Sequence, residues 1–278
     1  MISWHSVRML GPSHALSGAA AWLAASYTAS EIVHYHQTPV QIAVGTAICA
    51  GGALIPDLDM SGRVLTDQGG ATVAHTFGVV SLFAAECMEK LSLGIYDVTR
   101  TRRDPHRHNG HRTFTHTLVF NAALGYGVYE ALTHWGKPAV LVTLFLCFAF
   151  ALRGLLPGWE KRAGFMICTA AAAGITWWAA ASLPAHHAYP LLGAAVGAGG
   201  VVHLLGDMLT SHGCPIFWPV PIAGKTWYDA GVPHATAVKV GGKVEVFVLR
   251  PLFFIAAVAA VVALCFPWAY DRISHLRG

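Results

Sequence analysis

Long apolar segments constrain this chain more than any other feature of its sequence. A helix needs about 20 mainly apolar residues to cross a membrane, and only 12% of the residues are charged, against roughly 25% in an average soluble protein. The stretches that approach this length are residues 15–30, 40–55, 118–132, 139–156, 165–183, 191–209 and 252–270. We therefore predict an all-α, polytopic helical bundle of about seven spans, forming one integral membrane domain over residues 1–278.

An eighth apolar stretch, residues 72–91, is interrupted by His75 and by three charged residues. If it crosses the membrane, Asp57 and His116 fall on opposite sides and cannot share a site. If it is a re-entrant or interfacial helix, all the candidate ligands described below face one side, together with most basic loops, as expected for the cytoplasm. A fully spanning helix with the amino terminus outside also satisfies the charge rule for most loops. The ligand geometry therefore decides, and it favours the second topology.

The net charge of +4 is concentrated in a polar loop over residues 94–112. The basic residues there are Arg100, Arg102, Arg103, Arg107 and Arg112. This density is better explained by a cytoplasmic loop than by binding to nucleic acid, so no nucleic-acid partner is expected. Contact with anionic lipid headgroups would contribute about 1 kcal/mol per basic residue. Binding of an anionic substrate is a weaker alternative.

Two carboxylates follow the second apolar segment directly. Pro56 disfavours helix at the residue before it, so we expect an extended segment that presents Asp57 and Asp59. Residues two apart in such a segment point to opposite sides, so one would bind a metal and the other would orient or bridge. Carboxylates that emerge from hydrocarbon need solvent, a partner or a metal. An exposed acidic loop is the alternative.

His203 and Asp207 give the strongest indication of a metal in the sequence. They stand at i and i+4, which places both side chains on one face of a helix about one turn apart. An imidazole and a carboxylate so placed can chelate one ion. A structural hydrogen bond between the two side chains is the alternative.

Residues 110–117 place His111, Arg112 and His116 before another apolar segment. On a continuous helix the two histidines would lie about 140° apart, so we expect only His116 to be a ligand. His111 and Arg112 would instead orient ligands or contact substrate, since a guanidinium forks onto phosphate oxygens. Ionisable groups at the edge of hydrocarbon are by default candidates for a functional site.

Two further histidines complete the candidate ligand set. His14 lies in the first turn of the first apolar segment, with Ser13 as its expected N-cap, and His75 lies in the interrupted stretch. A lone histidine at a membrane interface often has no special role, so each depends on the convergence of the others. Histidine and carboxylate ligands without cysteine suit zinc, with manganese or iron as alternatives, and one or two ions.

Residues 210–250 are expected to form a cytoplasmic cap. Alternating valines around Gly241 and Gly242 predict a short β-hairpin over residues 237–249. Glu245 is its only acidic residue. We expect Glu245 to be exposed, and membership of the metal site is the alternative.

Three ordered motifs, residues 53–59, 111–117 and 203–213 with Phe217-Trp218-Pro219, resemble the YdjM-like family of LexA-regulated inner-membrane proteins assigned as metal-dependent hydrolases. His14 and the turn before Glu245 also sit where that family has similar residues, so the likeness runs over residues 11–251. Thr117 stands where the family usually has Ser, and the arginine-rich insert is longer. In ligand types alone, the chain is also similar to zinc-dependent phospholipase C.

The residues and the resemblance together predict a membrane-embedded hydrolase at the cytoplasmic face of the inner membrane. A metal-activated water would attack a phosphoester or lipid-linked substrate, with Asp59, His111 and Arg112 in the catalytic machinery and Arg112 neutralising developing charge. Membrane lipids are the expected partners. Non-catalytic metal binding or transport is a less favoured hypothesis, because transport needs ionisable groups near mid-membrane. A structural membrane protein, whose metal only joins helices, is the third hypothesis.

Overall fold

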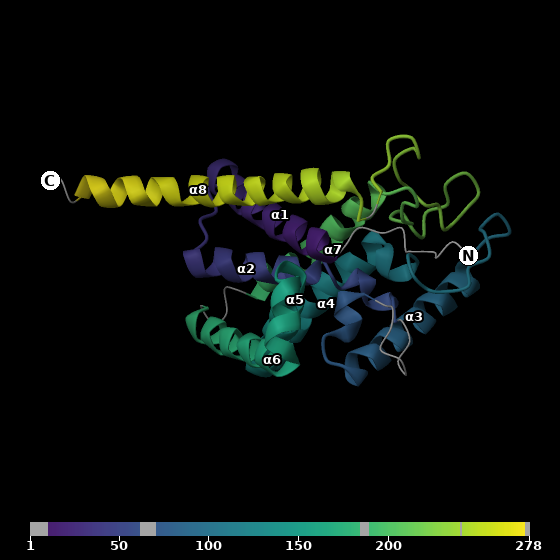
Figure 1. Cartoon of the computed structure of the whole chain (residues 1–278), viewed down its shortest axis with the longest axis horizontal. Coiled ribbons are helices and arrows are strands. Elements are labelled where there is room, and N and C mark those ends of the chain that lie inside the picture. The colour runs from purple at the N-terminus through teal and green to yellow at the C-terminus, as the bar shows by residue number, and fades with distance from the viewer. Residues whose placement is uncertain (1–10, 62–70, 184–188, 240, 276–278) are drawn as a thin grey trace.

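A computed structural model describes residues 11–61, 71–183, 189–239 and 241–275 of the chain. The α-helices are α1 (Gly11–Ile32), α2 (Pro39–Gly52), α3 (Val79–Thr99), α4 (Leu118–Trp135), α5 (Lys137–Leu155), α6 (Pro157–Ser182), α7 (Tyr189–Met208) and α8 (Arg250–His275), shown in Figure 1. Short 3-10 turns cover Pro56–Asp59, Thr72–His75 and Phe114–His116. Over these ranges the chain forms isolated β-bridges but no β-strand, so the all-α prediction is confirmed.

Five segments are long and apolar enough to cross a membrane. They are Pro39–Asp59, Lys137–Leu155, Gly164–Ser182, Pro190–Met208 and Glu245–Phe266. The expected count of seven spans is therefore not supported among the described helices. The expected spans in α1 and α4 contain polar residues that lower their mean hydropathy. α1 includes serines, a threonine and His14, and α4 includes Asn121 and Glu130.

The interrupted stretch at residues 72–91 is divided rather than continuous. Gly78 has a φ of 58°, a conformation that glycine adopts readily, and it separates the 3-10 turn Thr72–His75 from α3. α3 then runs to Thr99 and is not one of the membrane-capable segments. The polar loop therefore begins at Arg100, later than the expected residue 94.

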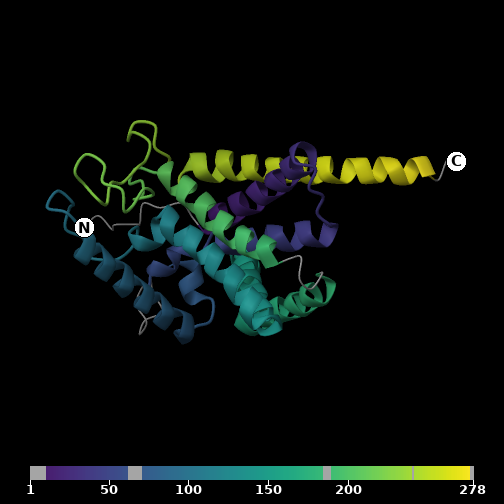
Figure 2. The same cartoon turned by 180° about the vertical axis from the view of Figure 1, so that it is seen from behind.

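α2 packs tightly against α5 and α7 because small residues line the contacts. A Cβ on Gly51 would lie 2.2 Å from the carbonyl oxygen of Cys147 in α5, and one on Gly199 in α7 would lie 2.4 Å from that of Cys49. Small residues allow such close approach between membrane helices. α4 and α7 also lie side by side (Figure 2), and a Cβ on Gly125 would come 2.8 Å from the carbonyl oxygen of Gly193.

The chain after α2 bends into the 3-10 turn Pro56–Asp59, so the predicted extended segment is wrong. Ile55 adopts a right-handed helical conformation, with φ −63° and ψ −40°, although a proline follows it. Pro56 itself occupies the start of the turn, where its fixed φ and missing N–H are tolerated.

α8 lies along α1, and its C-terminal part projects past the other helices (Figure 1). The predicted hairpin before it is wrong, because residues 243–244 are helical and Glu245–Leu249 form a π-helix that leads into α8. Gly241 turns the chain with a φ of 65°, and its N–H donates to Oε2 of Glu245 at 2.7 Å. The segment is thus helical despite the β propensity of its valines.

Ser13 and Glu245 also differ from expectation. Ser13 lies inside α1 rather than at its N-cap. Its hydroxyl donates to Oε1 of Glu245 and accepts a bond of 2.9 Å from Nε of Arg250. Glu245 is buried, not exposed, and it joins the start of α8 to α1 instead of joining the candidate metal ligands.

Candidate metal centre

Five of the predicted ligands meet at one place in the interior. His14 comes from α1, Asp57 from the turn after α2, His116 from the turn before α4, and His203 and Asp207 from α7. All five side chains are buried. Three groups could hold a metal ion, each with ligand atoms within 4.8 Å of one another: His14, Asp57 and His203; Asp57, His111 and His116; and His116, His203 and Asp207.

Four ligand atoms have spacings close to those around a single ion. Nε2 of His116 lies 3.2 Å from Nε2 of His203 and 3.4 Å from Oδ2 of Asp207. Nε2 of His203 lies 3.7 Å from the same oxygen. Oδ1 of Asp57 is 3.8 Å from Nε2 of His203 and 4.0 Å from that of His116. Tetrahedral zinc with bonds of about 2.0–2.1 Å implies ligand separations of about 3.3 Å.

The hydrogen bonds behind the two imidazoles define their tautomers. Nδ1 of His203 lies 2.7 Å from the carbonyl oxygen of Ala53, which can only accept, so we assign the proton to Nδ1 and a lone pair to Nε2. Nδ1 of His116 lies 3.3 Å from Oδ2 of Asp59 and 2.9 Å from Oγ1 of Thr115. The Thr115 hydroxyl donates to that same carboxylate, which leaves it to accept from His116.

Two lone pairs therefore face each other across 3.2 Å. They repel unless a cation lies between them, and that cation is either a proton or a metal ion. Burial disfavours a charged His116, but the carboxylates of Asp59 and Asp207 raise its pKa to about 9. A proton and a metal ion thus compete for the same position.

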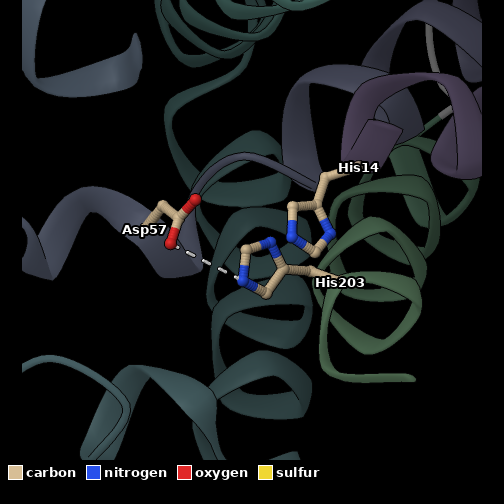
Figure 3. Close-up of side chains that lie close together, drawn as sticks. All are labelled: His14, Asp57 and His203. Atoms are coloured by element: carbon tan, nitrogen blue, oxygen red, sulfur yellow. Dashed lines mark ion pairs between the residues drawn. The ribbon is translucent and has the colours of Figure 1, made fainter. Parts of the chain in front are cut away.

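The unpartnered ring of His14 is a second feature that fits a bound ion. Neither nitrogen of its buried ring has a hydrogen-bond partner, although such groups are nearly always paired. The ring stacks on His203, with centroids 3.8 Å apart and planes inclined by 19°, as Figure 3 shows together with the approach of Asp57 to His203. Nε2 of His14 also lies 3.6 Å from Oδ1 of Asp207.

Asp59 and His111 form a pair beside this cluster. Oδ1 of the buried Asp59 lies 2.8 Å from Nδ1 of His111. His111 retains 19% side-chain exposure, whereas the other centre residues are nearly or fully buried. The expectation that His111 and His116 could not share an ion assumed a continuous helix. The segment instead forms turns and a short 3-10 helix, which brings both histidines near Asp57.

Arg112 points at the centre rather than at open space. Its guanidinium is buried, and Nη2 donates to Oδ1 of Asp207 at 2.7 Å. Nη1 donates to Oγ1 of Thr210 and to the carbonyl oxygen of Gly213. Its backbone φ of 57° is rare for a residue with a side chain. The structure thus places Arg112 where it orients a candidate ligand.

His75 is not part of any of the three groups. It ends the 3-10 turn that precedes Gly78, and its carbonyl oxygen accepts a bond of 3.2 Å from Nη1 of Arg153. The structure therefore does not bring this predicted ligand to the cluster.

Sequence reasoning missed Asn121, a buried residue in the first turns of α4. Its Nδ2 donates to the carbonyl oxygens of Thr115 and Thr117, at 3.0 and 2.9 Å. These bonds fix the turn that carries His116. An asparagine inside an apolar segment, five residues after a candidate ligand, was the available signal.

Sequence reasoning also missed the contacts between the basic loop that begins at Arg100 and the cap segment, residues 210–250. Oδ2 of Asp104 accepts from the N–H groups of Thr101 and Thr226, and Oδ1 accepts from that of Trp227. Burial opposes the charge of Asp104, but these hydrogen bonds lower its pKa. Arg107 adds an ion pair in which its Nη2 donates to both carboxylate oxygens of Asp229, at 2.8 and 2.7 Å. The loop that leads to His111 is thereby fixed beside the centre.

A family model described as YdjM inner membrane protein matches residues 9–273. No curated protein and no solved structure matches the chain significantly.

Proposed function

Because this chain belongs to the YdjM inner membrane protein family, we propose that it is a membrane-embedded, metal-dependent hydrolase whose buried histidines and aspartates hold a divalent ion. The family match and five membrane-capable segments place it among membrane proteins. The metal and the hydrolysis are the parts that we propose.

The observation that carries this proposal is the pair of facing Nε2 atoms in His116 and His203, 3.2 Å apart. Each ring has its Nδ1 committed to an acceptor behind it, which is how metal-binding histidines are generally held. Asp57 and Asp207 each have an oxygen within 4.0 Å of both nitrogens. Nitrogen and carboxylate ligands suit zinc, and manganese or iron are alternatives.

A second ion is compatible with the group formed by Asp57, His111 and His116. That group shares both Asp57 and His116 with the first site, and Nδ1 of His116 is already bound to Asp59 and Thr115, so a second ion would use Asp57 and His111. The number of ions is therefore one or two in this proposal.

When bound, a divalent ion acts as a Lewis acid and lowers the pKa of a coordinated water toward about 7. Among the described residues of the centre, His111 retains the most solvent access, with 19% of its side chain exposed. Asp59 accepts from Nδ1 of His111, so Nε2 carries the lone pair and can take a proton or return it at the reacting centre. Arg112 holds Asp207 by its Oδ1.

The proposed substrate is a phosphoester or a lipid-linked molecule at the cytoplasmic face. Support comes from the loop beside His111, where Arg102, Arg103 and the ring of His106 are exposed. Basic side chains favour anionic headgroups, and short loops rich in arginine favour the cytoplasm.

Purified protein reconstituted with anionic phospholipids tests the proposal. Hydrolysis should be metal-dependent and should disappear in Asp57→Ala and His203→Ala. His134→Ala is a matched control, because His134 is an exposed residue of α4 that contacts Glu130. Unchanged turnover in both centre variants would rule out this mechanism.

A structural metal is the second candidate, because the four central ligands are 5% exposed or less. Structural sites are closed by protein ligands, whereas catalytic sites keep a position open. Cobalt substitution separates the two. Visible spectra that change when an anion is added indicate an open position, and spectra that do not change favour the structural role.

A further inference from the structure

An apolar cavity of about 650 Å³ lies between α1, α7, α8 and the cap. Its lining includes Ala20 and Ala24 of α1, Leu205 and Leu209 of α7, and Phe253 and Ala256 of α8. Ser17 is the one polar side chain in the lining, and its hydroxyl already donates to the carbonyl oxygen of His14. The volume falls within the range of about 300–1,000 Å³ for small-molecule sites. The cavity therefore offers space for a hydrocarbon and no hydrogen bonds to hold a polar ligand.

The position of the cavity determines what can enter it. α7 and α8 lie in membrane-capable segments, and α8 exposes large apolar residues beside the cavity, including Phe254 and Ile255. Two walls of the cavity therefore belong to segments that can lie in a membrane, where the available molecules are lipid chains.

A cation lies on α8 next to the cavity, although it does not line it. Arg250 lies one turn before Phe253 on α8, and its Nε donates to Ser13, the residue before His14. Its buried Nη2 stands 4.0 Å from Oε1 of Glu245, but 26% of the side chain remains exposed. An accessible guanidinium edge is suited to a phosphate oxygen.

We infer that this cavity binds one hydrocarbon chain of an anionic membrane phospholipid, with the phosphate of its headgroup at Arg250. The inference rests on the proposed function in one respect, since it names the class of molecule that reaches the centre. The cavity ends beside the centre, because Gly206 and Met208 flank Asp207 and Ser17 follows His14 by one turn.

Photolabelling tests the inference on the full-length protein in nanodiscs. The probe is phosphatidylglycerol with a diazirine in one acyl chain, and labelled residues are mapped by mass spectrometry. Labelling is expected on the cavity face of α1 and α7 and should be lost in Ala24→Phe, which fills the cavity. Ala25→Phe is the matched control, because Ala25 is the exposed neighbour of Ala24 and does not line the cavity. Ala256→Phe fills the cavity from the facing helix and should give the same loss.

Arg250→Gln tests the headgroup contact. It should reduce the preference for phosphatidylglycerol over phosphatidylcholine carrying the same diazirine chain. Equal labelling of Ala24→Phe, Ala256→Phe and Ala25→Phe, or labelling confined to the outer face of α8, would overturn the inference.

Hydrolysis measured on the same samples separates this inference from the proposed function. Cavity labelling without hydrolysis supports the lipid site and contradicts the hydrolase. Metal-dependent hydrolysis without cavity labelling supports the hydrolase and contradicts the lipid site.

Discussion

Arg112 and Asp207 form a buried ion pair in which Nη2 lies 2.7 Å from Oδ1. Because Oδ1 is taken by the guanidinium, Oδ2 is the oxygen that faces the histidines, 3.4 Å from Nε2 of His116 and 3.7 Å from that of His203. Arg112 thus orients Asp207 as a ligand of the proposed metal, and it balances the carboxylate charge at Oδ1, away from the histidines.

Arg112→Gln should therefore weaken both the fold and the metal site. Removing one partner of a buried ion pair costs about 3–5 kcal/mol, and Asp207 would be free to rotate. The melting temperature and the metal dissociation constant measure the two effects. Arg112→Lys keeps the charge without the fork and should lie between wild type and Arg112→Gln. A glutamine variant with wild-type values for both would contradict the positioning role.

Metal content should depend on residues that are distant in sequence and should not depend on His75. His116→Ala, His203→Ala and Asp207→Asn should each lose the bound ion in mass spectrometry of purified protein, because each removes one ligand of a shared site. His75→Ala should retain it, since His75 lies outside the three candidate groups. Retention by all the variants would leave no shared metal site.

Asp59→Asn should reduce metal affinity without abolishing it. Asp59 accepts from His111 and approaches Nδ1 of His116, so it orients two imidazoles without lying in a ligand group itself. Loss of such an orienting partner typically lowers metal affinity by about 10–100-fold. Competition with a fluorescent chelator measures the change. A complete loss equal to that of Asp57→Asn would instead make Asp59 a direct ligand.

Gly199→Ala should disturb the centre through the backbone. The added Cβ would lie 2.4 Å from the carbonyl oxygen of Cys49 and 2.7 Å from the amide nitrogen of Ala53, and the carbonyl of Ala53 holds His203. Overpacking costs about 1–3 kcal/mol, so the melting temperature and metal affinity should both fall. Gly127→Ala is the control. Its Cβ meets nothing within 4 Å, and alanine favours helix by up to about 1 kcal/mol.

Asp104→Asn should loosen the basic loop from the cap in a pH-dependent way. Burial favours the neutral acid, but hydrogen bonds lower the folded-state pKa of Asp104 below the unfolded value of about 3.9. The stability that the Asp104 carboxylate contributes is therefore fully present above the unfolded-state pKa. It is lost as the pH falls through the folded-state pKa.

At neutral pH, the amide protons of Thr101, Thr226 and Trp227 should exchange faster in the Asp104→Asn variant. The free energy of local opening should fall by about 1.5–3 kcal/mol, the value of a hydrogen bond to a charged group. The gap in melting temperature between wild type and variant should narrow below about pH 4. A gap that widens on acidification would contradict this assignment.

Local patterns predicted the parts of the centre that depend on one helix. The i, i+4 spacing placed His203 and Asp207 on one face of α7, and both enter the same group. Contacts across long separations were not readable in this way. The pairing of Asp59 with His111 spans 52 positions, and the approach of Arg112 to Asp207 spans 95.

The errors have local physical causes. The valines near residue 244 favour a strand, yet the bond from Gly241 to Glu245 starts a helix there. Pro56 disfavours helix before it, yet Ile55 is helical because a 3-10 turn follows directly. His75 was placed by its position in an apolar stretch, which the turn at Gly78 breaks.

The stacking of His14 on His203 has a consequence for biogenesis. One wall of the centre emerges from the ribosome at the beginning of the chain, and the other follows 189 positions later, which at about 5–20 residues per second is roughly 10–40 s. During that interval His14 has no stacking partner, and no ion can be held by the complete set. Under the proposed function, metal acquisition would then follow insertion of α7, so a bound ion would mark a chain that has been inserted as far as α7.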